Sequence, residues 1–317
     1  MNNSRPLVAI HCLVYNHEPY LRDCFEGFVM QQTNFPFVAI VHDDASTDGS
    51  AEIIHEYERK YPHIFKPIYE DSNVYSQGGF TVVNQIMNRA IDATGAKYVA
   101  LCEGDDYWTD SLKLQKQVDI LENNQNYTMC YTNYATVNSQ NTPINWTNKD
   151  INITYSKTGD IFPQLLKGNF VQTCTILYRT EICEDLEFLA QLDYEYALQN
   201  AIQGNCFFLD DITANYRLQP NSAIHTMNEK LKYISIDIWS RYVGRYLNNK
   251  TYKRSFWEHV HIMSTISARM ISMVRSERLN EIEIVGKILK ENPIVFIYMP
   301  FGLIIRVYNV IRKYINL

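Results

Sequence analysis

The stretch Tyr98-Val-Ala-Leu-Cys-Glu-Gly-Asp-Asp-Tyr-Trp108 decides the fold, because an apolar run ends abruptly there in three carboxylates spaced over four residues. The apolar part is typical of a buried strand, and Gly104 permits a tight turn behind it. Three crowded carboxylates raise one another's pKa unless a cation neutralises them, so a divalent ion such as Mg²⁺ or Mn²⁺ is one interpretation. A solvated acidic loop with Asp110 as a helix N-cap is the other. The three carboxylates belong to Glu103, Asp105 and Asp106.

The 317-residue chain has the composition of an ordered globular protein, with 46% hydrophobic and 20% charged residues. This length accommodates one large core, or one core and an appendage. The seven cysteines are odd in number, widely spaced and mostly inside apolar runs, so we expect reduced core thiols rather than zinc ligands or disulfides. The N-terminus lacks an apolar signal-peptide region and leads directly into a predicted strand. We therefore expect a cytoplasmic active domain.

Charge is divided unevenly along the chain. Residues 1–225 carry 14 Lys and Arg against 28 Asp and Glu, and residues 226–317 carry 15 against 7, so balances of −14 and +8 give the net charge of −6. The acidic first part argues against nucleic-acid binding there. The basic second part could meet an anionic lipid surface or dock on the acidic part.

The predicted elements of the first 110 residues alternate between strand and helix. The apolar run 7–14, a helix over about 20–32 and a strand over 37–41 form a βαβ unit. Parallel strands end at one edge of a sheet, where α/β proteins bind ligands, so we expect Tyr15, Asp44 and the opening stretch to line one cleft. The remaining elements are a helix over 51–61, a strand over 64–69, a polar loop over 72–79, a helix over 80–93 and the strand at 98–101.

The second part of the chain begins with a mixed pattern and ends with a helical one. We expect a polar excursion from the core over 136–159. The apolar segment 294–315 is interrupted by Pro300 and Gly302 and carries Arg306, which favours an interfacial or docked segment over a membrane-spanning helix. The other predicted elements are helices over 112–122, 194–203, 231–247, 252–274 and 279–289, and strands over 127–134, 171–178, 206–209 and 213–217.

Five motifs, taken in order and spacing, resemble the inverting family-2 glycosyltransferases, which have a nucleotide-sugar-binding GT-A fold. The resemblance covers about residues 7–225 and implies a Rossmann-like, mostly parallel central sheet flanked by helices. We therefore predict a catalytic domain over 1–225, with a donor half to about 110 and an acceptor half from about 111, and a helical basic extension over 226–317. The motifs are Leu7–Asn16, Val41–Ser50, Leu101–Trp108, Asp193 before its predicted helix, and Tyr216-Arg217 before His225.

The resemblance implies roles for side chains around the nucleotide. Tyr15 would stack on the base, with Asn16 beside it at the donor site, and Asp44 would accept a hydrogen bond from the uracil N–H. Arg217 or His225 would assist at the diphosphate, or His225 would be a further metal ligand. For both residues a structural role is the open alternative.

The resemblance also implies the catalytic parts. Asp106 would be the metal ligand of an Asp-x-Asp-type motif, Asp105 would contact the ribose or sugar of the donor, and Glu103 occupies the first acidic position of the motif. Asp193 falls where the family places its general base. Two departures from the family pattern are Glu103 in place of the usual Asp and Leu192 where Gly is common.

The implied function is transfer of a hexosyl or N-acetylhexosaminyl group from a nucleotide sugar, expected to be UDP-linked, to a hydroxyl with inversion, in surface polysaccharide or other glycan synthesis. A divalent metal, Mn²⁺ or Mg²⁺, would stabilise the leaving diphosphate, and a carboxylate base would take the acceptor proton. The expected partners are the donor, a glycan or lipid-linked glycan acceptor, the inner face of a membrane through 226–317, and a second copy of the chain.

Two other functions use similar features. A sugar nucleotidyltransferase also holds metal with carboxylates, but it usually needs a Gly-rich basic loop after the first strand, and here Tyr15–Pro19 is followed by no Lys or Arg before Arg22. A non-catalytic nucleotide-sugar-binding or assembly protein of the same fold is the other alternative. Four acids expected in the active site are present and argue against the loss of catalytic activity. They are Asp44, Asp105, Asp106 and Asp193.

Overall fold

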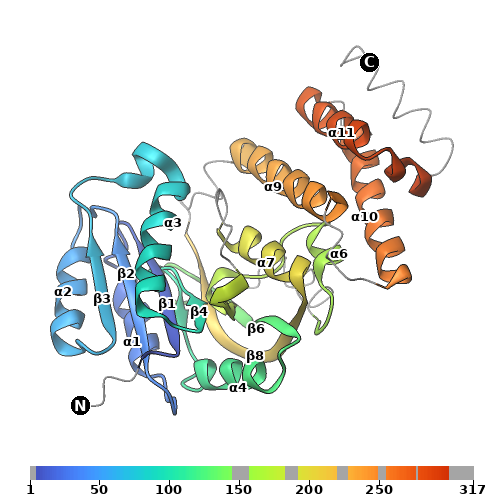
Figure 1. Cartoon of the computed structure of the whole chain (residues 1–317). Coiled ribbons are helices and arrows are strands. Elements are labelled where there is room, and N and C mark those ends of the chain that lie inside the picture. The colour runs from blue at the N-terminus through green and yellow to red at the C-terminus, as the bar shows by residue number, and fades with distance from the viewer. Residues whose placement is uncertain are drawn as a thin grey trace. The chain divides into compact units, whose positions relative to one another are not determined.

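The computed structural model of the chain describes residues 5–144, 157–182, 192–219, 228–248, 255–275 and 278–299. The chain divides into two compact units. The first comprises Met1–Ile161 and Phe170–Thr226, and the second comprises Phe162–Asn169 and Met227–Leu317. Figure 1 shows a sheet covered by helices in the first unit and helices alone in the second.

The first half of the sheet is parallel, in the order β3-β2-β1-β4. Its strands are the apolar runs of the sequence, and burial on both faces explains why these runs are nearly continuous. Alternate residues of β1, from Val8 to Val14, join α1, α2 and α4 in one core, whereas α3 packs against the other face of β1 and β2. The elements are β1 (Val8–Val14), α1 (Leu21–Val29), β2 (Phe37–Asp43), α2 (Ser50–Lys60), β3 (Phe65–Tyr69), α3 (Val74–Thr94), β4 (Tyr98–Leu101) and α4 (Lys113–Asn123).

The second half of the sheet is mixed and continues as β4-β7-β6-β8-β5. Strands β7 and β5 run antiparallel to their neighbours, while β6 and β8 pair in parallel. The expected α/β class, with a parallel Rossmann-like half flanked by helices, is confirmed. The elements are β5 (Tyr107–Trp108), β6 (Tyr127–Asn138), β7 (Leu177–Arg179), α7 (Leu192–Gln203) and β8 (Asn205–Leu218).

Several predicted boundaries differ from the structure. Strand β6, expected to end at residue 134, runs to Asn138 and so into the predicted polar excursion. Helix α3 begins at Val74 instead of residue 80 and carries a kink at Gly79, whose φ of 65° and ψ of −166° are non-helical. The two strands expected over 206–209 and 213–217 are one strand, β8, whose pairing with β6 shifts register near Asn133. The strand expected over 171–178 is a 3₁₀ turn, Thr173–Thr175, followed by the short β7.

The cysteines are confirmed as core thiols where the structure describes them. All six are buried and free of disulfides. Cys183, the seventh, lies outside the described residues. The six are Cys12, Cys24, Cys102, Cys130, Cys174 and Cys206.

The second unit is helical, as expected from the basic C-terminal pattern. Its core includes Trp239, Tyr242 and Met263, all buried. Among the described residues, none of the helices combines the length and apolar character needed to cross a bilayer. The elements are α6 (Phe162–Leu165), α9 (Asn228–Asn248), α10 (Phe256–Arg275), α11 (Leu279–Glu291) and the 3₁₀ segment η3 (Pro293–Tyr298).

Candidate active site

The acidic turn, Glu103–Asp106, follows β4 and lies against the end of β1. The Gly104 N–H donates to the Leu13 carbonyl at 2.9 Å, and the Asp106 N–H closes the turn on the Glu103 carbonyl at 3.1 Å. A Cβ on Gly104 would lie 2.8 Å from Nδ1 of His17 and 3.1 Å from Leu21. Glycine is therefore required here by the close approach of β1 and α1. Backbone conformation is not the reason, because the φ of Gly104 is not positive.

Asp106 is the most buried acid of this turn, with 2% of its surface exposed. Its Oδ1 accepts a hydrogen bond of 2.8 Å from the main-chain N–H of Arg217. Burial raises the pKa of Asp106 well above its ordinary value, and the negative charges of Asp105 and Glu103 raise it further, against the opposing effect of the Arg217 N–H. The Arg217 N–H and the thiol of Cys174 favour the ionised form, but burial and the neighbouring charges outweigh them, which is the electrostatic condition that favours a cation.

The neighbouring acid Asp105 is tied to β8 and to the residue just after it. Its Oδ2 accepts from Nε2 of Gln219 at 2.8 Å, and its main-chain oxygen accepts from Nε of Arg217 at 2.7 Å. Glu103 is partly exposed, and its carbonyl accepts from the buried thiol of Cys24 at 3.5 Å. Gln219 was not identified from the sequence, where no motif singled it out.

The loop after β1 carries Tyr15 and Asn16, and it is bound to the loop after β2. Tyr15 is 45% exposed, an unusual state for an aromatic side chain at the end of a buried strand. Asn16 adopts a left-handed conformation with φ 55°, donates its N–H to Oγ of Ser46 at 2.9 Å and accepts from the Thr47 N–H at 2.8 Å through Oδ1. Asn16 therefore fixes the two loops beside the exposed ring.

A reciprocal pair of hydrogen bonds strengthens this junction. The Glu18 N–H donates to Oδ2 of Asp48 at 3.0 Å, and the Gly49 N–H donates to Oε2 of Glu18 at 2.9 Å. Each loop thus satisfies donors of the other, so hydrogen bonds from both sides tie the loop that carries Tyr15 to the loop after β2.

Asp44 lies in the loop after β2 and is 5% exposed. Its Oδ1 accepts from the Val74 N–H at 2.6 Å and its Oδ2 from the Tyr75 N–H at 3.1 Å. Both oxygens therefore bind donors at the first turn of α3, whose N-terminal amides have no partner within the helix. A carboxylate can accept more than two hydrogen bonds, so a further contact with a base stays compatible with this role.

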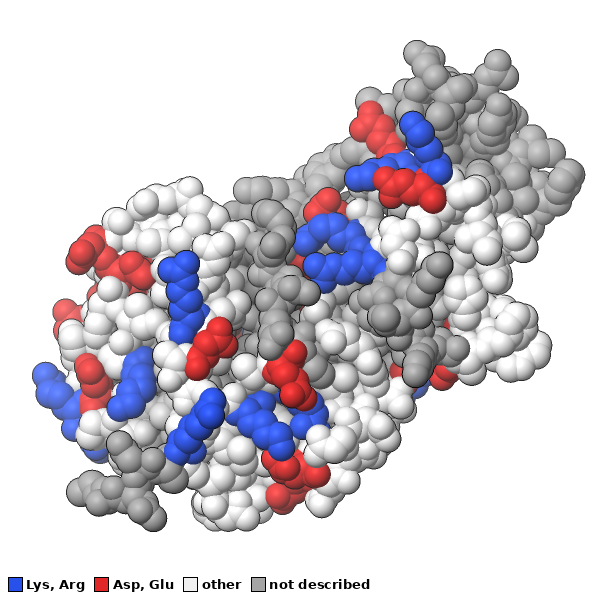
Figure 2. Space-filling view, viewed as in Figure 1, with Lys and Arg blue, Asp and Glu red and all other residues white. Residues whose placement is uncertain are grey.

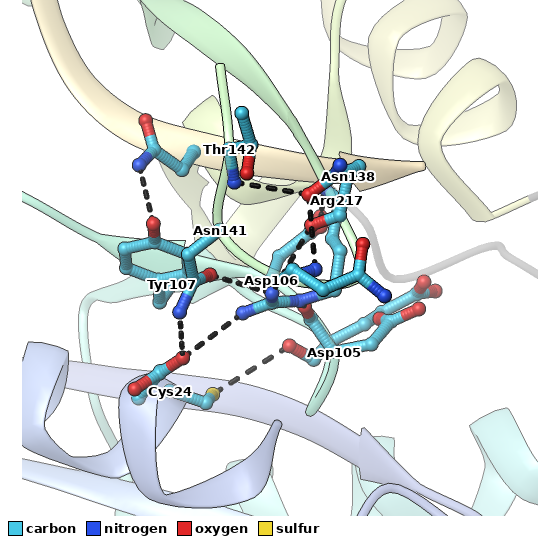
Figure 3. A network of polar contacts seen from close by, with 12 residues as sticks. Cys24, Asp105, Asp106, Tyr107, Asn138, Asn141, Thr142 and Arg217 are labelled. Atoms are coloured by element: carbon cyan, nitrogen blue, oxygen red, sulfur yellow. Dashed lines mark hydrogen bonds and ion pairs between the residues drawn. The ribbon is translucent and has the colours of Figure 1, made fainter. Parts of the chain in front are cut away.

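Arg217 is buried near the end of β8, beside Asp105 and Asp106 (Figure 3). Its side chain has no exposed surface. Its hydrogen bonds go to protein oxygen atoms, including the Asp105 carbonyl and the Asp23 carboxylate. A structural role, in which Arg217 supports the acidic turn, therefore competes with the expected contact to the diphosphate.

The remaining two predicted residues are only partly within view. Helix α7 begins at Leu192, so Asp193 lies in its first turn instead of preceding it, and its side chain is outside the described part of the chain. His225 lies outside the described residues altogether. Among the residues that the structure describes, no three His, Cys, Asp or Glu side chains form a group that could hold a metal ion.

Charge on the viewed face gives no sign of a nucleic-acid surface. Figure 2 shows Lys and Arg side chains of the first unit interspersed with Asp and Glu, with no extended basic patch among the described residues on that face. A basic stripe is the usual electrostatic feature of nucleic-acid binding. The arrangement instead concentrates polar and acidic groups at the ends of β1, β2 and β4.

The profile described as "Glycosyl transferase family 2" matches residues 10–187, which is more than half of the chain. The chain belongs to this glycosyltransferase family. An uncharacterized Mycobacterium tuberculosis protein, Rv1520, is 31% identical over 290 residues, which cover 89% of this chain and 72% of that protein. TuaG of Bacillus subtilis, whose name assigns it to teichuronic acid biosynthesis, is 26% identical over 70% of this chain and 83% of its own.

Solved structures with the same fold support the GT-A architecture of this family-2 member. Staphylococcus aureus TarS in complex with UDP-GlcNAc aligns with a TM-score of 0.52 at 14% identity, over 97% of this chain and 90% of that chain. The mannosyltransferase PcManGT from Pyrobaculum calidifontis, in complex with GDP-Man and Mn²⁺, aligns with a TM-score of 0.54 at 13% identity, over 99% and 88%. At these identities the similarity concerns the fold alone.

Proposed function

We propose that the protein transfers a sugar, with inversion, from a UDP-linked donor to a hydroxyl group in the synthesis of a surface polysaccharide or another glycan. The observation that carries the proposal is the buried, poorly compensated carboxylate of Asp106, in a turn at the same sheet edge as Asp44 and the exposed ring of Tyr15. Membership of family 2 supports the class of reaction. The name of TuaG assigns it to teichuronic acid biosynthesis, which supports polysaccharide synthesis as the setting for this protein, and the UDP-GlcNAc bound to TarS supports a UDP-linked donor.

Residues of the acidic turn are suited to a divalent cation. Burial and neighbouring negative charge raise the pKa of Asp106, and a bound cation would relieve both the repulsion and the missing solvation. In this proposal Asp106 holds Mn²⁺ or Mg²⁺, with His225 as a further ligand and Glu103 less directly involved. The metal supplies Lewis-acid stabilisation of the charge that develops on the leaving diphosphate.

The donor nucleotide would lie across the ends of β1, β2 and β4. Tyr15 offers an exposed ring for stacking, and Asn16 holds that loop in place. Asp44 orders the first turn of α3 and keeps acceptor capacity for a base N–H. Asp105 contacts the sugar or ribose, and Arg217 supports the turn without touching the donor.

Asp193 is proposed as the general base for the acceptor hydroxyl, because inversion requires a base on the face opposite the leaving group. Asp193→Asn should retain donor affinity and lower the rate of transfer by roughly 10²–10⁴-fold. Donor affinity from calorimetry and transfer rates measured with one preparation separate the two effects. An unchanged transfer rate would remove Asp193 as the base.

Attachment to the inner face of a membrane is proposed for the second unit, together with a cytoplasmic location. Phe256 and Trp257 at the start of α10 are 70% and 77% exposed, and the region 226–317 has a balance of +8. Exposed aromatic rings beside basic charge suit an anionic lipid surface. Co-sedimentation with anionic vesicles tests this attachment, and sedimentation equilibrium tests the proposed homodimer.

The decisive experiment is calorimetry of UDP and GDP with the purified chain, with Mn²⁺ or with a chelator. We expect UDP to bind only with the metal and more tightly than GDP. Metal-independent binding would contradict the metal site, and preference for GDP would contradict the UDP assignment. A panel of nucleotide sugars with Mn²⁺, scored for slow hydrolysis, then identifies the sugar without knowledge of the acceptor. Failure of every nucleotide to bind would favour a non-catalytic protein of the same fold.

A further inference from the structure

Arg217 is held in an environment that is rare for arginine. Arginine is almost never fully buried unless it is paired, and here no surface of the side chain is exposed. The guanidinium carbon lies 4.6 Å from the ring centroid of Tyr20 and 5.2 Å from that of Tyr107. Aromatic faces on two sides and hydrogen-bond acceptors around the edge fix the guanidinium group in one orientation.

On one side Arg217 holds the acidic turn. Its side-chain Nε donates to the Asp105 carbonyl at 2.7 Å, and its main-chain N–H donates to Oδ1 of Asp106 at 2.8 Å. The same residue thus binds two successive positions of the turn, once through its side chain and once through its backbone.

On the other side Arg217 binds the hairpin tip, residues 138–142. In this tip the chain turns back after the end of β6, and the Asn138 N–H donates to the Thr142 carbonyl. One terminal nitrogen donates to Oδ1 of Asn141 at 2.6 Å and lies 3.5 Å from the Asn138 carbonyl. The other donates to Oδ2 of Asp23 in α1 at 3.1 Å, and Nδ2 of Asn141 donates to the same oxygen at 2.9 Å. The three side chains of Arg217, Asn141 and Asp23 close a ring of hydrogen bonds, most of which is visible in Figure 3.

The distribution of charge in this ring matters for the site. Arg217 reaches the acidic turn through the neutral carbonyl of Asp105, and within the described residues its ion pair is with Asp23. Its positive charge is therefore paired with Asp23, while it contacts Asp105 through a main-chain carbonyl and Asp106 through its own main-chain N–H. A Lys at this position would have the charge but not the planar set of donors that binds all three partners at once.

We propose that Arg217 is a positioning residue that couples the hairpin tip to the acidic turn, so that Asn141 and Asp23 determine the order of Asp105 and Asp106 from a distance. Arg217 has no open face toward a ligand, so its effect passes through the turn. The hairpin tip lies in the polar excursion predicted over 136–159, within the predicted acceptor half of the domain. If the proposed function holds, the coupling joins the donor side of the site to the acceptor side.

Hydrogen exchange of the ligand-free chain tests the coupling with Asn141→Gly. Glycine adopts the left-handed φ of 61° found at Asn141 without strain, so this variant removes only the side-chain amide. Loss of roughly 1 kcal/mol of hydrogen bonding should speed exchange of the Gly104, Asp106 and Arg217 amides by about fivefold. The control is Gln140→Ala, an exposed neighbour in the same tip, which should leave these rates unchanged. Unchanged exchange in Asn141→Gly, or equal acceleration in both variants, would overturn the proposal.

A second measurement distinguishes coupling from a general loss of stability. Asp23→Asn keeps the shape of the acceptor but removes the charge, and Arg217→Lys keeps the charge but removes the fork. We expect both variants to speed exchange in the acidic turn and to leave exchange in β2 and β3 unchanged; uniform acceleration would overturn the coupling. The predicted loss of UDP–Mn²⁺ affinity in Asn141→Gly, again about fivefold, rests on the proposed function. Absence of UDP binding in the unmodified chain would count against that function, while the exchange result would still decide the coupling.

Discussion

The loop after β2 and the acidic turn after β4 both place a buried carboxylate at the same edge of the sheet, but the protein treats the two charges differently. Asp44 receives two main-chain N–H donors from α3. Asp106 receives one, from Arg217, and has the charges of Asp105 and Glu103 beside it. The fold satisfies the hydrogen-bonding capacity of the first carboxylate at both oxygens. It leaves the ionised form of the second poorly stabilised.

This difference separates an acid whose charge the fold already stabilises from an acid whose charge requires a bound cation. N–H donors stabilise the ionised form of the carboxylate that they bind, and the carboxylate in turn orders those donors. A buried carboxylate with like charges around it destabilises its own ionised form, and a protein gains from such a group only when a cation binds there. We therefore expect substitution by a neutral side chain to lower metal-dependent binding at Asp106 and the free energy of unfolding at Asp44.

The largest expected effect is on metal-dependent binding. Asp106→Asn should weaken binding of UDP with Mn²⁺ by about 100-fold or more, since removing a metal ligand exceeds the effect of removing a supporting partner. Calorimetry with and without chelator measures the loss. Asp211→Asn is the matched control, because Asp211 is an exposed acid paired with Lys116. Equal affinity in Asp106→Asn and the control would show that the acidic turn is a solvated loop.

A smaller effect is expected on stability at the other acid. Asp44→Ala should lower the free energy of unfolding by roughly 1–2 kcal/mol, because it removes the acceptors for two N–H groups at the start of α3. Urea unfolding gives the value, and exchange of the Val74 and Tyr75 amides shows where the loss occurs. Asn73→Ala is a useful comparison, since the Asn73 side chain accepts from one N–H group at the start of α3, that of Ser76. An Asp44→Ala chain of unchanged stability that loses UDP binding would show that Asp44 acts only as the proposed ligand for the base and does not stabilise the start of α3.

The parallel half of the fold could be predicted from the sequence because its signal is local. Runs such as Val8–Val14 and Tyr98–Leu101 are apolar throughout, since both faces of their strands are covered. The placement of Tyr15 and Asp44 at one edge follows from that prediction alone, because parallel strands end together. The prediction divided β8 in two because of the acidic pair at Asp210 and Asp211, whereas in the structure β6 pairs with β8 on both sides of this pair, with a register shift between Leu209 and Ile212.

The contacts of the supporting residues could not be predicted, because their partners are distant in the chain. Arg217 and Asp23 are 194 positions apart, and nothing in either local sequence indicates the other. The early start of α3 has the same cause, since Asp44 binds the N–H groups of that helix from 30 positions away. Sequence patterns therefore identified the acids at the edge, and tertiary contacts decided which of them the protein satisfies.

The smallest expected effect is on the pH dependence of stability without metal. Because the pKa of Asp106 is raised in the folded chain, the folded state binds this proton more tightly than the unfolded state does. The free energy of unfolding should therefore fall as the pH rises from about 3.9, the ordinary carboxyl pKa, through the raised value. Urea unfolding in chelator should show this fall in stability for the unmodified chain and a weaker fall for Asp106→Asn. Saturating Mn²⁺ should remove the fall from the unmodified chain. Parallel curves in chelator would mean that Asp106 is as well compensated as Asp44, and the distinction between the two acids would be lost.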